Sequence, residues 1–124
     1  MQNNNNSLKN KSFIEAWKKA FAGIAYAFKS QRNLKIQSVI AIIVIIIGIV
    51  AKFSIAEWIA IMIVTMLVII TEVINTAIEE AVNLCTQKYH PIAKLAKDTA
   101  AGAVVLASLT AVIVAILIII GRCI

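Results

Sequence analysis

The sequence predicts an all-α integral membrane protein, in which an N-terminal amphipathic surface helix precedes three transmembrane helices. Two observations lead to this prediction. Hydrophobic residues make up 61% of the 124 residues and charged residues only 15%, which differs from the composition of ordinary soluble domains. The apolar residues are also gathered into three long runs, and the whole chain contains only four Gly and one Pro. A chain of this length accommodates one domain.

The polar first segment, residues 1–10, reads "MQNNNNSLKN" and is predicted to be a disordered tail. Residues 11–30 are predicted to form an amphipathic interfacial helix. Large apolar side chains recur there at steps of three or four, at Phe13, Trp17, Phe21, Ile24 and Phe28. Lysines lie nearly opposite this stripe. Such a helix is expected to lie in the membrane interface, and packing on the protein's own spans is compatible with that position.

The remaining residues, 31–124, are predicted to form a three-span membrane domain. The expected spans are 35–52, 55–84 and 91–121. About 20 apolar residues cross a hydrocarbon core about 30 Å thick. The third run has this length, and the first two runs reach it only together with their polar flanking residues. Pro91 suits the first turn of the last helix, because its missing N–H costs nothing there. The first turns of that helix are expected to protrude from the membrane.

The charges predict the orientation of the chain. Of twelve basic residues, seven precede the first long apolar run and three lie between the second and third runs, which leaves Lys52 and Arg122 for the other side. By the positive-inside rule, the N-terminus is expected on the cytoplasmic side of the membrane. No basic module with base-stacking aromatics is present, so a nucleic-acid partner is not expected.

A polar cluster at the cytoplasmic end of the second span is the candidate functional site. Its members are Glu72, Asn75, Thr76, Glu79 and Asn83, which share an arc of about 100° on a helix. Carboxylates near hydrocarbon are costly and usually have a function. The structural alternative is polar hydrogen bonding between helices. Two acids on one face repel each other, however, and require a cation or a proton between them.

Two kinds of cation satisfy that requirement. Lys97, beside Asp98 on the third span, is one, and Mg²⁺ held by hard oxygen ligands is the other. Acid, amide, lysine and metal together fit phosphoryl transfer, in which positioning and charge neutralisation dominate. Two alternatives of different class stay open at this point. One is a small proton-coupled transporter with Glu72 as the proton carrier, and the other is a non-catalytic membrane assembly protein.

Two stretches, "EVINTAIEEAVN" and "YHPIAKLAKDTAAGAV", resemble the prokaryotic diacylglycerol kinases and their relatives, the undecaprenol kinases. The likeness extends over nearly the whole chain from about Phe13. It implies a homotrimer of three-span subunits with an active site between helices at the cytoplasmic interface. It also implies transfer of the ATP γ-phosphate, with Mg²⁺, to a membrane lipid alcohol. Undecaprenol is slightly favoured over diacylglycerol.

The resemblance implies a role for each matching residue. Glu72 is the expected catalytic base, Asn75 the amide that helps to hold the site, and Glu79 a ligand of the metal that accompanies ATP. The residues expected to bind ATP are Lys88, Tyr89, His90, Lys97, Asp98 and Glu79. Those expected to meet the lipid are Glu72, Asn33, Lys35 and Ala101. From the residues alone, His90 fits a helix cap before Pro91.

The chain departs from the family pattern at several positions. Gln31 stands where better-known members have a second metal-binding carboxylate, and an amide offers an oxygen but no charge. Asn83 stands where relatives often have Asp. Lys19 and Ser12 replace residues that contact the nucleotide.

Overall fold

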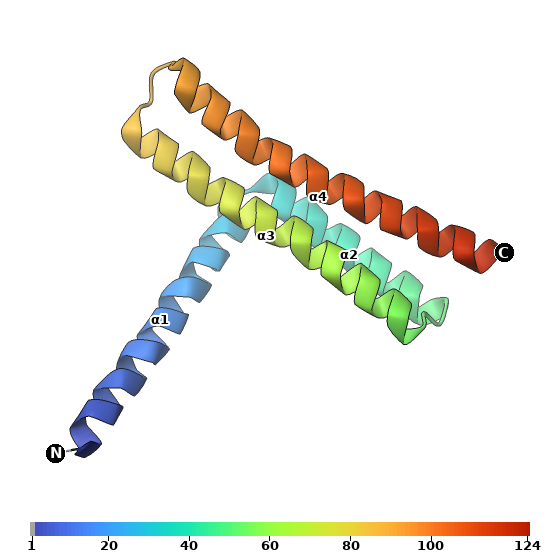
Figure 1. Cartoon of the computed structure of the whole chain (residues 1–124), viewed down its shortest axis with the longest axis horizontal. Coiled ribbons are helices and arrows are strands. Elements are labelled where there is room, and N and C mark those ends of the chain that lie inside the picture. The colour runs from blue at the N-terminus through green and yellow to red at the C-terminus, as the bar shows by residue number, and fades with distance from the viewer. Residues whose placement is uncertain (1) are drawn as a thin grey trace.

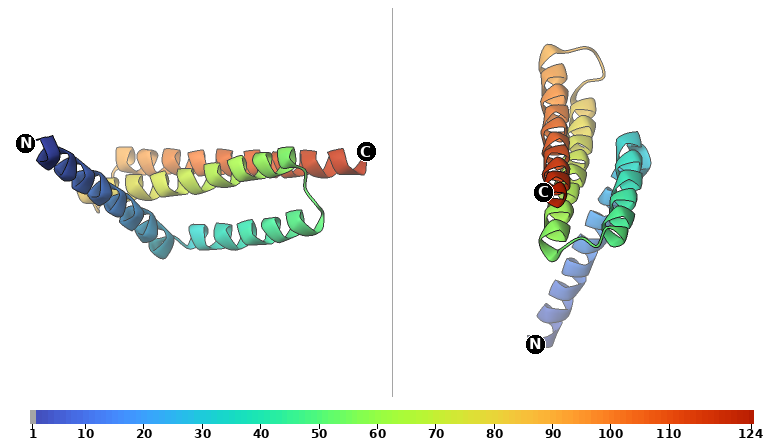
Figure 2. Two further views of the ribbon diagram at one scale, coloured as in Figure 1. Left: turned by 90° about the horizontal axis from the view of Figure 1, so that it is seen from below. Right: turned by 90° about the vertical axis from the view of Figure 1, so that its right-hand side faces the viewer.

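A computed structural model of the protein describes residues 2–124, with side chains described from residue 6 onward. These residues form four helices: α1 (Gln2–Ser30), α2 (Arg32–Val50), α3 (Ile55–Cys85) and α4 (Pro91–Cys123). In Figure 1, α3 and α4 lie side by side along most of their length, and α1 projects away from the other three. Figure 2 shows α2 running alongside the α3–α4 pair at a larger separation.

Within residues 2–124, three helices are long and apolar enough to cross a membrane, and these are α2, α3 and α4. This confirms the predicted all-helical class with three candidate spans. The core lies between α3 and α4, where Val64 and Val68 are buried with Ala100, Val104 and Ala107. Small residues on α4 let the two helices approach closely. The buried polar residues among those described are Glu72, Asn75 and Thr76, all on α3.

Residues 2–10, which belong to the segment predicted as a tail, are the first turns of α1. Met1 lies outside the described residues. No Pro or Gly interrupts this segment, and each residue added to an existing helix gains one backbone hydrogen bond. Farther along α1, the aromatic stripe is exposed and self-stacked. The ring centroids of Phe13 and Trp17 are 6.0 Å apart, and those of Trp17 and Phe21 are 5.8 Å apart.

A single extended residue, Gln31, separates α1 from α2. Its backbone N–H donates to the carbonyl of Ala27 at 2.9 Å. Ala27 and Leu34, on either side of this elbow, are buried against the bundle. The elbow turns the chain and places the Gln31 side chain beside α3.

The turn between α2 and α3 is compact and capped. Lys52 adopts a positive φ of 53°, and Ser54 and Glu57 form a reciprocal capping box that begins α3. Gly48 is required for the close approach of the two helices. A Cβ at Gly48 would lie 2.5 Å from the Trp58 ring and 2.9 Å from that of Phe53.

Arg122 fastens the end of α4 to this turn. Its Nε and Nη2 donate to the two carboxylate oxygens of Glu57, each at 2.8 Å. Nη1 and Nη2 also donate to the carbonyls of Ala51 at 2.9 Å and Lys52 at 3.1 Å. The guanidinium lies 4.9 Å from the ring centroid of Phe53. One side chain therefore joins the end of α4 to the start of α3 and to the turn that follows α2.

Candidate active site

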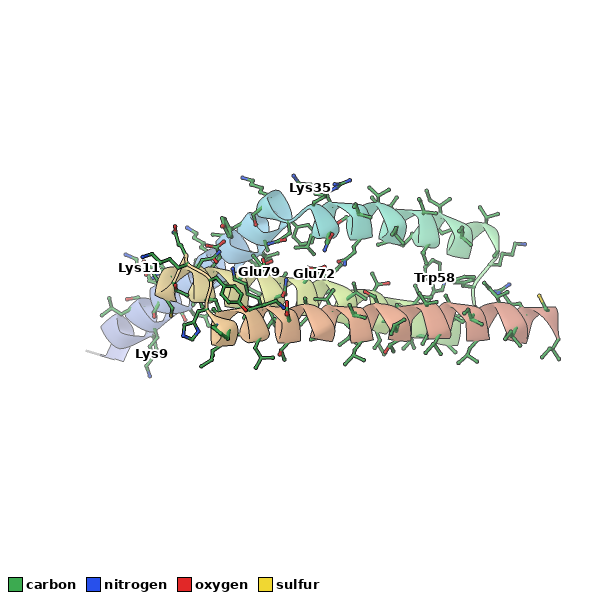
Figure 3. All side chains as sticks on the ribbon, turned by 90° about the horizontal axis from the view of Figure 1, so that it is seen from above. Lys9, Lys11, Lys35, Trp58, Glu72 and Glu79 are labelled. Atoms are coloured by element: carbon green, nitrogen blue, oxygen red, sulfur yellow. The ribbon has the colours of Figure 1, made fainter. Side chains whose placement is uncertain are left out.

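Glu72 occupies the centre of the predicted site. It lies on α3 with only 2% of its surface exposed. The amide Nε2 of Gln37, on α2, donates to its Oε1 at 3.1 Å. Figure 3 shows Glu72 and Glu79 near the end of the bundle from which α1 departs, and Trp58 at the opposite end. The Gln37 amide therefore orients the Glu72 carboxyl group within the bundle.

Glu79 is held on both oxygens by amides. Nδ2 of Asn75 donates to Oε1 at 3.1 Å, and Nε2 of Gln31 donates to Oε2 at 3.1 Å. The two predicted metal ligands, Glu79 and Gln31, are thus brought into direct contact from α3 and the α1–α2 elbow. Oδ1 of Asn75 is buried, and among the described residues it has no hydrogen-bond partner. The site therefore contains an unused oxygen beside a carboxylate.

A cavity of about 260 Å³ lies between the ends of α3 and α4. It is lined by five of the residues predicted to bind ATP: Lys88, Tyr89, His90, Lys97 and Asp98. Glu79 is not part of this lining and lies about one turn before Asn83, at 3.6 residues per turn. The cavity and the two carboxylates therefore follow one another along α3.

Lys97 and Asp98 do not act as a contacting pair. Lys97 Nζ donates to Oδ1 of Asn83 at 2.6 Å, and Lys94 Nζ pairs with Asp98 at 2.5 Å. Consecutive residues of a helix point in different directions, so each finds a partner of its own. Asn83, which replaces a frequent Asp of the family pattern, thereby positions Lys97.

His90 caps α4, as its place before Pro91 indicated. Its Nδ1 accepts the backbone N–H of Ile92 at 3.2 Å, and Pro91 occupies the first helical position. This contact fixes the imidazole at the rim of the cavity. Capping therefore explains the place of His90 without any ligand.

Comparisons with known proteins identify the family of this chain. The family model for prokaryotic diacylglycerol kinase matches residues 18–119. The chain belongs to the prokaryotic diacylglycerol kinase family. A diacylglycerol kinase of Synechocystis sp. is 39% identical over 104 residues, which are 83% of this chain and 59% of that protein. An undecaprenol kinase of Bacillus subtilis is 39% identical over 108 residues, which are 87% of this chain and 85% of that protein.

Membership in a family of membrane lipid kinases favours the kinase hypothesis over the transporter and the assembly protein. The range matched by the family model includes both carboxylates, the elbow residue Gln31 and the whole lining of the cavity. The alignment with the Synechocystis kinase spans about three fifths of that protein's length.

Three of the residues predicted to contact the lipid are exposed, whereas Glu72 is buried. Asn33 and Lys35 are exposed on α2, and Ala101 is exposed on α4. Figure 3 shows Lys35 on the outer side of α2. Their part in lipid binding stays a prediction.

Two contacts of the site were not predicted from the sequence. One is Gln37 with Glu72. Gln37 is an amide at the start of an apolar run, where polar groups need hydrogen-bond partners, and this position was the signal that could have indicated the contact. The other joins Tyr26, on α1, to Glu80, on α3. The Tyr26 hydroxyl donates to Glu80 at 3.0 Å. This hydrogen bond raises the pKa of the Tyr26 phenol above its usual value, so the phenol remains a donor at neutral pH.

Proposed function

We propose that this family member transfers the γ-phosphate of ATP to the hydroxyl of a membrane lipid alcohol, undecaprenol or diacylglycerol. The observation that carries the proposal is the buried Glu72 carboxylate, which the Gln37 amide holds at one oxygen. A carboxylate at the membrane edge reaches a lipid hydroxyl, accepts its proton and thereby activates it as a nucleophile. Glu79 lies about 10 Å farther along α3, which leaves room for a phosphoryl group between the two acids.

The nucleotide is assigned to the cavity between the ends of α3 and α4. Lys88, Lys94 and Lys97 place positive charge around it, and these ammonium groups complement the phosphates of ATP. Asn83 holds Lys97 in position through its contact at 2.6 Å. Tyr89 and His90 complete the wall toward the loop.

Mg²⁺ is assigned to Glu79, Asn75 and Gln31, because their chemistry fits a hard cation. Glu79 supplies a carboxylate, and Asn75 supplies a buried Oδ1 that no described residue uses. Gln31 presents its amide nitrogen to Glu79 at 3.1 Å, so this side chain must turn over to offer its oxygen. When bound, the metal neutralises phosphate charge during transfer. With Gln in place of a second acid, Glu79 carries the only negative charge of this set.

The lipid is assigned to the membrane face of α2 and α4, with Asn33, Lys35 and Ala101 around the headgroup level. We propose a bacterial plasma membrane, with the N-terminus and the site on the cytoplasmic side, and α1 in the interface through its aromatic stripe. Undecaprenol is the first choice of substrate. This preference is supported by the undecaprenol kinase of Bacillus subtilis, because the alignment covers 85% of its length.

A homotrimer is proposed because one copy buries little of its own spans. In the most apolar window of each span, 22% of residues are buried for α3 and 11% for α2 and α4. Contacts between copies cover part of that surface, as van der Waals packing drives helix association in lipid.

The experiment that tests the function follows labelled γ-phosphate from Mg·ATP to lipid. Purified wild type and Glu72→Gln are compared in mixed micelles with undecaprenol or diacylglycerol. Wild type is expected to label one lipid preferentially, and Glu72→Gln to be at least about 100-fold slower because the general base is lost. Absence of labelled lipid with folded wild-type protein contradicts the proposal.

A further inference from the structure

Gln37 connects α2 to the buried carboxylate of Glu72. Its Nε2 donates to Glu72 Oε1 at 3.1 Å. An ionised carboxylate only accepts hydrogen bonds, so the amide nitrogen faces Glu72 and the amide oxygen points elsewhere. The contact therefore fixes the orientation of both ends of the amide.

The amide oxygen of Gln37 is not used by the fold. Oε1 is buried, and no described residue donates a hydrogen bond to it. The neighbouring Ser38 behaves differently, because its hydroxyl donates to the carbonyl of Leu34 in its own helix at 2.7 Å. A buried acceptor without a partner costs free energy, so a ligand that brings a donor to Oε1 is stabilised there.

Gln37 is one of the residues that line an apolar cavity. This cavity has a volume of about 290 Å³, lies between α2, α3 and α4, and has walls such as Val44, Val68 and Ala111. Gln37 is its lining residue nearest the start of α2, and the other polar groups are the hydroxyls of Thr65 and Ser108. A hydrocarbon chain suits these walls, and its hydroxyl end then meets Gln37.

We propose that Gln37 binds and positions the lipid hydroxyl, an inference that rests on the proposed lipid kinase function. Oε1 accepts the hydrogen bond of the incoming hydroxyl while Nε2 holds one oxygen of Glu72. Because both atoms belong to one amide, a hydroxyl bound at Oε1 lies beside the Glu72 carboxylate. The amide thus brings nucleophile and base together.

The transfer step then balances as follows. The O–H bond of the lipid breaks and its proton passes to Glu72. The hydroxyl oxygen forms a bond to the γ-phosphorus, and the bond from that phosphorus to the bridging oxygen of ATP breaks. ADP and the phosphorylated lipid leave, and Gln37 neither gains nor loses a proton.

The test compares wild type with Gln37→Met, which keeps a side chain of similar length and removes both amide atoms. Ser38→Ala is the matched control, because Ser38 bonds within its own helix. For Gln37→Met, kcat/KM for the lipid is expected to fall at least about tenfold. The KM for ATP and the midpoint of thermal unfolding are expected to match wild type and Ser38→Ala, which a purely structural role would not allow.

Three outcomes overturn the proposal. Equal kcat/KM for the lipid in Gln37→Met and wild type shows that the amide is dispensable. A parallel loss of ATP binding and of the unfolding midpoint shows that Gln37 only packs α2 against α3. Absence of lipid phosphorylation by folded wild type removes the proposed function as well, and this result is distinguishable because it does not involve the variant.

Discussion

At the scale of single residues, the site is held together by amides. Gln37 holds Glu72, and Gln31 and Asn75 hold Glu79. In the described structure no lysine contacts either acid, since Lys97 binds Asn83 and Lys94 binds Asp98. Lys94 and Lys97 therefore do not pair with Glu72 or Glu79, and their ammonium groups are available to bind phosphate.

Lys97→Met tests this assignment. The variant removes the charge but retains most of the apolar stem. We expect the KM for Mg·ATP to rise about tenfold or more, because a charge-assisted contact to phosphate is lost. Steady-state kinetics with saturating lipid measure this effect. An unchanged KM for ATP would place the nucleotide elsewhere, and Lys9→Met, on the distant part of α1 in Figure 3, is the control.

Gln31→Glu tests the metal assignment. A second carboxylate beside Glu79 adds charge to the ligand set, and hard cations bind more tightly as ligand charge increases. The Mg²⁺ concentration that gives half-maximal activity is therefore expected to fall several-fold. A magnesium titration of initial rates at fixed ATP measures it. A higher requirement in the variant would mean that Gln31 contacts Glu79 only to position it.

At the scale of elements, Gly48 determines how closely α2 approaches the beginning of α3. Gly48→Ala places a methyl group 2.5 Å from the Trp58 ring, and such overpacking costs about 1–3 kcal/mol. The unfolding midpoint in micelles is expected to fall. Gly121→Ala is the control from the same end of the bundle, because nothing lies within 4 Å of its added Cβ. Equal midpoints for the two variants would refute the packing argument.

Arg122 also stabilises the end of the bundle that contains the turn between α2 and α3. Its planar guanidinium donates to both oxygens of Glu57 and to two backbone carbonyls, which the ammonium group of lysine cannot reproduce. Arg122→Lys is therefore expected to lower the unfolding midpoint almost as much as Arg122→Met. Thermal unfolding of the purified variants measures this difference. Full rescue by lysine would show that charge alone suffices.

The helices were largely predictable from the sequence and the contacts between them were not. Apolar runs and the position of Pro91 are local signals, and they indicated α2, α3 and α4 within a few residues. The contact of Gln31 with Glu79 joins residues 48 positions apart, and that of Arg122 with Glu57 joins residues 65 apart. Such contacts depend on helix packing, which no local pattern specifies.

At the scale of the whole molecule, the two cysteines mark opposite ends of the bundle. Cys85 ends α3 beside the candidate site and Cys123 ends α4, and both are exposed and free. If the site is cytoplasmic, a membrane-impermeant thiol reagent applied to intact cells modifies Cys123 and spares Cys85. Mass spectrometry of the Cys85→Ser and Cys123→Ser variants measures the labelling of the one cysteine that each variant retains. Labelling of Cys85 alone would reverse the proposed orientation.

Gln31 has two roles that belong together physically. It is the single residue between α1 and α2, and its side chain holds Glu79. Because this one residue joins the two helices and also contacts Glu79, a change in the angle between α1 and α2 moves a hydrogen-bond partner of Glu79 directly. If α1 rests in the headgroup layer as proposed, the packing of the surrounding lipids affects the partner of Glu79 through Gln31 alone.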